Sequence, residues 1–194
     1  MFKVCNKLPS ALKTVFNEID AAYSAELYYL ALSVSLTIPD ICAAAEFTDP
    51  TKHVRAVDYI AWCDKFLLED TPTAPDGKSK LVEGSDIYHL RGGLIHKGHF
   101  KHNKRQFEHV GFCLPGGELE MHKVVVNAKE KILFLRLSEF LDEMRRAAEN
   151  WYQSNSENET VLQNCERVLV ARTMPVNLPG FGQRNARLLI DGDI

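Results

Sequence analysis

The residues best suited to chemistry lie in one short segment, DIYHLRGGLIHKGHF, which spans residues 86–100. It contains Arg91 together with His89, His96 and His99. An imidazole titrates near neutral pH and can move a proton, whereas a guanidinium stays cationic and pairs with phosphate oxygens. Arg91 and His96 could therefore act together on a phosphodiester.

The spacing of Arg91 and His96 does not by itself bring them together. We predict a helix that begins near Asp86, after Ser85, and in a regular helix Arg91 faces an apolar arc while His96 lies on the opposite side. A break or widening at Gly92–Gly93 would unite them, since each glycine costs about 1 kcal/mol in a helix interior. A second copy of the helix across a dimer axis would do the same.

A basic strip begins at Arg91, because no acidic residue occurs from Arg91 to Phe107. Its five positive charges belong to a chain of net charge −3, so the remaining residues carry −8. This local concentration is typical of a phosphate-binding surface on a protein that is not itself basic. The residues of this strip that would contact the phosphates of a nucleic acid are Lys97, His99, Lys101, Lys104 and Arg105. The alternative is a solvated, lysine-rich loop.

A metal site is the less favoured interpretation of the histidines. His96, His99 and His102 recur every three residues, which is a spacing that zinc could use. No adjacent cysteine or carboxylate completes a familiar ligand pattern, and Lys97 and Lys101 would repel a cation. We therefore expect no metal.

Arg91 also has a purely structural interpretation. An unpaired buried cation is costly, so an arginine on an apolar helix face is expected to pair with a carboxylate. Glu26 and Asp40 are candidates for that partner. The five cysteines are scattered without a CxxC pair, which indicates buried free thiols.

The remaining pattern predicts a mainly α fold, a helical bundle with a small β-hairpin inserted after the helix of Arg91. Apolar periodicity predicts helices over about 10–37, 39–47, 51–68 and 132–151, the last with a strand-like start, and a loop over 69–80. Leu27 and Leu30 are expected on the buried face of the first helix. Two strands joined by a Pro-Gly-Gly turn predict the hairpin at about 107–127.

Length and composition predict one domain with an extension. The helical domain is expected to cover 1–155, and residues 156–194 to form a C-terminal extension that is docked or loose. The start has no signal-peptide pattern, and no apolar stretch approaches 18 residues. We therefore predict a cytoplasmic protein that does not associate with membranes.

The segment LRGGLIHKG resembles the motif of the HEPN superfamily, an arginine followed after four to six residues by a histidine. Arg91 and His96 match that motif with four residues between them. SVSLTIPDI and YIAWCDKFL, upstream, are similar to segments of bacterial members, and the resemblance extends loosely over residues 10–150. It implies a small helical bundle with the motif at a helix end.

The resemblance also implies an activity. Many HEPN proteins are metal-independent endoribonucleases in which arginine and histidine of two protomers meet at the dimer interface. His96 would then act as general acid or base, and Arg91 would stabilise the phosphorane formed when a 2′-hydroxyl attacks. No cofactor is implied. The implied partners are a second copy, RNA or a nucleotide, and an antitoxin-like protein, as in a toxin or phage-defence system.

Gly92 departs from the HEPN pattern, in which the residue after the arginine is usually polar in active members. Some relatives only bind nucleotides or serve as dimerisation modules. The alternative function is therefore a non-catalytic helical module that binds RNA, a nucleotide or a partner protein.

Overall fold

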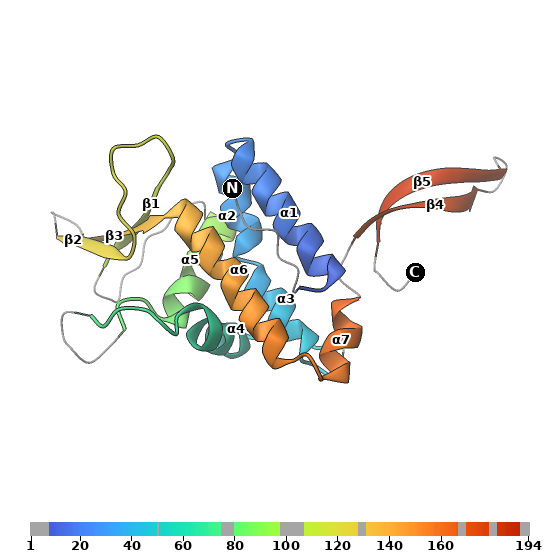
Figure 1. Ribbon diagram of the computed structural model, residues 1–194, viewed down its shortest axis with the longest axis horizontal. Helices are drawn as coiled ribbons and strands as arrows, with labels where there is room; N and C mark the ends of the chain where they lie inside the picture. The colour runs from blue at the N-terminus through green and yellow to red at the C-terminus, as the bar shows by residue number, and fades with distance from the viewer. Residues whose placement is uncertain are drawn as a thin grey trace.

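The protein is a mainly helical bundle with a small three-stranded sheet (Figure 1). The computed structural model describes residues 8–49, 51–74, 80–97, 107–127, 131–166, 170–178 and 182–190, the last two ranges by their backbone. Its helices are α1 (Ser10–Ser24), α2 (Tyr28–Ser35), α3 (Ile38–Ala45), α4 (Ala56–Trp62), the π-helix η1 (Cys63–Leu67), α5 (Gly84–Lys97), α6 (Leu137–Ser154) and α7 (Glu159–Cys165). Its strands are β1 (His109–Cys113), β2 (Val124–Asn127), β3 (Lys131–Arg136), β4 (Val170–Leu178) and β5 (Gly182–Ile190). The mainly α class is thus confirmed.

Helix α6 is the central element of the bundle and crosses its middle in Figure 1. One face is buried, with Leu137, Phe140, Leu141, Met144, Ala147, Ala148 and Trp151 all in the core. Burying each large apolar side chain stabilises the fold by roughly 1.5–3 kcal/mol. The Trp151 indole donates a hydrogen bond to Glu46 Oε1 at 2.7 Å, which fixes α6 against the end of α3.

The single helix predicted over 10–37 is wrong, because the chain turns between α1 and α2. Glu26 has φ of 60°, and the Leu27 amide donates to the Ala22 carbonyl at 2.8 Å. This pairing closes a helix end through a left-handed residue, a position that glycine or asparagine usually occupies. Glutamate gives no such signal in the sequence. The short helix with Pro39 in its first turn is confirmed as α3.

The helix predicted over 51–68 begins later, at Ala56, where the Asp58 carboxylate accepts the Arg55 amide at 3.0 Å. Its last turn widens into the π-helix η1, and the Leu68 amide donates to the Cys63 carbonyl. A widened turn shifts the side chains that follow it. Here it accompanies a contact in which Asp64 Oδ1 accepts the Gly84 amide at 2.7 Å.

The hairpin predicted over 107–127 is wrong, although both of its strands exist. β1 and β2 do not pair with each other; β3 lies between them, parallel to β1 and antiparallel to β2. The predicted strand-like start of the final helix is therefore β3, which supplies the missing partner for both. The expected loop over 69–80 is irregular in its described residues, apart from a bridge between Thr73 and Lys80.

The C-terminal residues contain α7 and an antiparallel ribbon of β4 and β5. Figure 1 shows the ribbon extending away from the helical body beyond α7. One described segment, Tyr28–Ala45, is apolar and long enough to cross a membrane, but half of it is buried inside the protein. A buried core helix passes the same test, so this segment gives only weak evidence for a membrane span.

Two glycines of α5 give a direct test of how this helix is seated. A Cβ at Gly84 would lie 2.4 Å from the Ile60 carbonyl oxygen, whereas a Cβ at Gly92 would meet nothing within 4 Å. We expect Gly84→Ala to destabilise the protein by about 1–3 kcal/mol, because the backbone at Ile60 would have to move to admit the methyl group. Gly92→Ala should stabilise it by about 0.4–1 kcal/mol, because the unfolded chain loses freedom. Urea unfolding measures both, and a loss of stability in Gly92→Ala would contradict an unbroken α5.

Candidate functional site

Arg91 is held between three helices. Its Nε lies 2.7 Å from Asp40 Oδ2 on α3, and its guanidinium carbon lies 5.6 Å from the centre of the Tyr59 ring on α4. The Tyr59 hydroxyl in turn donates to the Leu36 carbonyl at 2.9 Å. The Arg91 and Asp40 side chains are 27% and 24% exposed, so the pair lies at the edge of the core. Of the two carboxylates predicted as partners, Glu26 and Asp40, it is Asp40 that forms the ion pair.

The environment of Asp40 is not that of an ordinary surface carboxylate. Burial raises the pKa of Asp40, and the neighbouring Arg91 lowers it less, so the pKa remains above its ordinary value. Within the described residues, the contacts of the Arg91 guanidinium are with Asp40 through Nε and with the Tyr59 ring. No hydrogen bond to either Nη nitrogen is found there, which leaves the N–H groups of both nitrogens as donors for an anion.

His96 is exposed near the end of α5, away from Arg91. The helix runs through Gly92 and Gly93 without a break or widening, so that expectation is wrong. Five residues along a regular helix place the two side chains about 140° apart around its axis. One copy of α5 therefore presents Arg91 and His96 on different sides, and of the two predicted arrangements only the second copy remains.

The predicted RNA-binding residues fall mostly outside the described residues. Lys97 is exposed and is the last residue of α5. The others, His99, Lys101, Lys104 and Arg105, lie outside the described ranges, as does His102. Among the residues that the structure describes, no group of three or more histidine, cysteine or acidic side chains could hold a metal ion.

Exposed apolar side chains occur on α5 close in sequence to Arg91 and at the start of α2, which contacts α5. The Tyr29 hydroxyl donates to the Leu94 carbonyl at 2.9 Å, which joins the start of α2 to the end of α5. We call the exposed apolar residues of the two segments that this contact joins the α2–α5 patch: Leu27, Tyr29, Leu30 and Ile95, which are 54%, 61%, 49% and 43% exposed. Ile95 lies four residues after Arg91, about 40° around the helix.

The sequence did not predict the α2–α5 patch. It placed Leu27 and Leu30 on the buried face of one long helix, and that placement is wrong because the turn at Glu26 redirects the chain. Large apolar side chains that are exposed near one another are a feature of surfaces that bind another molecule. The patch therefore adds a possible contact surface beside Arg91.

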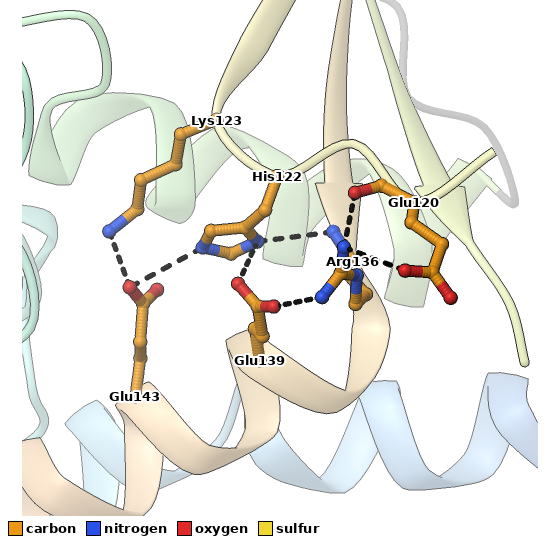
Figure 2. A network of polar contacts seen from close by, with 6 residues as sticks. All are labelled: Glu120, His122, Lys123, Arg136, Glu139 and Glu143. Atoms are coloured by element: carbon orange, nitrogen blue, oxygen red, sulfur yellow. Dashed lines mark hydrogen bonds and ion pairs between the residues drawn. The ribbon is translucent and has the colours of Figure 1, made fainter.

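A second polar cluster joins the segment before β2 to the β3–α6 junction (Figure 2). The Arg136 amide donates to His122 Nδ1 at 3.1 Å, so the proton of the neutral imidazole resides on Nε2. His122 Nε2 lies 3.4 Å from Glu143 Oε1, and Lys123 Nζ donates to the same oxygen at 2.6 Å. This pattern fixes the tautomer of His122.

The same cluster holds an unusual backbone conformation. Lys123 has φ of 52°, a value that non-glycine residues adopt at a cost. The Arg136 guanidinium binds the Glu139 carboxylate and the Glu120 carbonyl, which ties this segment to the first turn of α6 (Figure 2). The cluster therefore fastens the sheet to the bundle. No pattern of spacing in the sequence brings these residues together.

Comparison with known proteins gives no match: no protein-family model, no curated protein and no solved structure matches this chain. The functional argument therefore depends on the residues themselves.

The polar cluster predicts a pH dependence of stability. Burial raises the pKa of Glu143, but hydrogen bonds from His122 and Lys123 outweigh it, so its pKa in the fold is lowered. The folded protein then binds fewer protons than the unfolded chain, and this stabilisation is lost as pH falls through the lowered pKa. Glu143→Gln should cost about 1–3 kcal/mol at pH 7. In urea unfolding, the difference from wild type should shrink as the pH falls below the ordinary glutamate pKa of 4.5 and through the lowered pKa of Glu143.

Glu69→Gln serves as the control, because Glu69 is exposed on the neighbouring segment. It should change stability little at either pH. An equal loss in Glu143→Gln at neutral and acidic pH would show that the carboxylate charge does not contribute.

Proposed function

We propose that this protein is a metal-independent endoribonuclease of HEPN type that works as a homodimer in the cytoplasm. One observation supports it best: Asp40 holds Arg91 through Nε while both Nη nitrogens lack a hydrogen bond in the described structure, and His96 is exposed on the same helix. An oriented guanidinium and an accessible imidazole are the two groups that this chemistry needs. A role as a toxin or in phage defence, with an antitoxin-like partner, is part of the proposal.

Arg91 would bind the scissile phosphate. A guanidinium with one edge fixed by a carboxylate loses little further freedom when its other nitrogens bind phosphate oxygens. Its charge would stabilise the additional negative charge of the phosphorane. Asp40 would then act as a positioning residue, since it contacts Arg91 rather than the RNA.

His96 would transfer protons. As a base, its neutral imidazole takes the proton of the 2′-hydroxyl, whose oxygen attacks the adjacent phosphorus while the bond to the 5′-oxygen breaks. The imidazolium formed in this way then gives that proton to the leaving 5′-oxygen, so that one His96 serves first as base and then as acid. The products would be a 2′,3′-cyclic phosphate and a 5′-hydroxyl.

The proposal requires two copies of the chain. Because Arg91 and His96 diverge on a continuous α5, each phosphate would have to meet Arg91 of one copy and His96 of the other. The α2–α5 patch supports this arrangement, since it provides apolar surface beside Arg91 that a second copy would cover.

His96→Ala tests the catalytic role without disturbing the core. His96 is exposed, so the fold should survive, and RNA cleavage in the presence of a chelator should fall by at least about 100-fold. His89→Ala is the matched control, because His89 is an exposed histidine on the same helix. It should retain cleavage. Product ends are then examined for the cyclic phosphate, and cleavage that persists in His96→Ala would refute the assignment.

The dimer surface can be tested separately. Leu30→Asp and Ile95→Asp place charges in the α2–α5 patch and should each raise the dimer dissociation constant at least about tenfold, because a buried unpaired charge is costly. Val57→Asp is the control, since Val57 is 57% exposed on α4. Sedimentation velocity over a dilution series measures the constants. If all three variants dimerise like wild type, the patch is not the interface.

The alternative is a non-catalytic module that binds RNA, a nucleotide or a partner protein. The Asp40 ion pair favours it, because that pair gives Arg91 a structural role without catalysis. Gly92 also lacks the polar side chain that is usual at this position in active HEPN proteins. This alternative predicts binding that weakens with salt and yields no cleaved product.

A further inference from the structure

The β4–β5 ribbon is a part of the described structure that has no role in the proposed activity. Its strands pair along their full length, from Val170 opposite Ile190 to Leu178 opposite Gly182. A two-stranded ribbon by itself is marginally stable in water. Since the ribbon extends away from the helical body, its stability calls for a further surface against which it packs (Figure 1).

The register divides the ribbon into two unlike faces. Residues directly opposite each other lie on the same face, and residues alternate between faces along each strand. One face carries Val170, Met174, Val176, Leu178, Leu188 and Ile190, together with Arg172 and Arg184. The other face carries Thr173, Asn177, Gln183, Asn185 and Arg187 among its positions. The first face is mainly apolar, and the second is mainly polar although it also carries Ala171, Pro175 and Leu189.

The composition of the ribbon is that of a protein interface. From residue 170 to 190 there is no lysine, aspartate or glutamate, and the charged residues are three arginines. Interface cores are enriched in arginine and methionine and depleted in lysine and acidic residues. The apolar face includes two of those arginines and Met174.

Charge indicates which protein would cover that face. The ribbon carries +3 and the whole chain −3, so the remainder of the chain carries −6. A second copy therefore offers an acidic body to a basic ribbon, and two such contacts form when both copies exchange their ribbons.

We propose that the β4–β5 ribbon is a dimerisation arm whose apolar face packs on the helical body of a second copy. The arm extends the proposed homodimer but does not depend on its catalysis. Exchange of arms lets each copy stabilise the ribbon of the other, and it adds apolar contact to that of the α2–α5 patch.

Substitutions on the two faces of the same ribbon test the arm. Met174→Glu and Leu188→Glu each place a carboxylate on the apolar face, whereas Thr173→Glu and Asn185→Glu make the same charge change on the polar face. Sedimentation velocity over a dilution series gives the dimer dissociation constant. We expect the apolar-face variants to raise it at least about tenfold. The polar-face variants should stay within about threefold of wild type.

A crosslink identifies the surface that the arm contacts. A photoreactive phenylalanine analogue at position 176 should give an adduct of twice the monomer mass, with peptides from the helical body of a differently tagged copy. A crosslink confined to one chain, or a dissociation constant unchanged by the apolar-face substitutions, would overturn the proposal. Loss of RNA retention only in the polar-face variants, with dimerisation intact, would assign the ribbon to RNA instead.

The outcomes separate this inference from the proposed function. If dimerisation depends on the arm but the protein cleaves no RNA, the proposed arm is supported and the proposed ribonuclease activity is refuted. If cleavage depends on His96 but the arm substitutions leave the dimer dissociation constant unchanged, the ribonuclease activity is supported and the arm is refuted.

Discussion

The ion pair between Arg91 and Asp40 is the interaction around which the candidate site is organised. An arginine on a largely apolar helix face is tolerated only with a carboxylate partner, and Asp40 reaches it from α3 while Tyr59 lies beside it from α4. Three helices therefore determine where one guanidinium lies. The pair is only partly buried, so Arg91 remains near the surface.

Because α5 is one unbroken helix, the position of Arg91 also determines how far it lies from His96. Helix widening does occur in the protein, but in η1 rather than at the glycines of α5. There it accompanies the contact between Asp64 and Gly84 that seats the start of α5. A straight α5 separates Arg91 from His96, so a site that uses both groups has to be built from two chains.

The sequence predicted the mainly α class, α3, the approximate position of α5 and a carboxylate partner for Arg91, with Asp40 as one of two candidates, because each has a local signal. Proline in a first turn, apolar periodicity and the cost of a buried cation are such signals. The turn at Glu26 was missed because glutamate rarely adopts a left-handed conformation. The hairpin was wrong because the partner of both strands, β3, comes later in the chain. The cluster around His122 depends on that same long-range pairing.

Complementation between inactive variants tests the two-chain site most directly. Arg91→Ala and His96→Ala proteins are each purified, shown by circular dichroism to be folded, and then mixed so that heterodimers form. Each heterodimer would have one site with both Arg91 and His96, contributed by different copies. RNA cleavage in a chelator should therefore be absent from either variant alone and should return in the mixture. A mixture as inactive as its components would contradict a site shared between two chains.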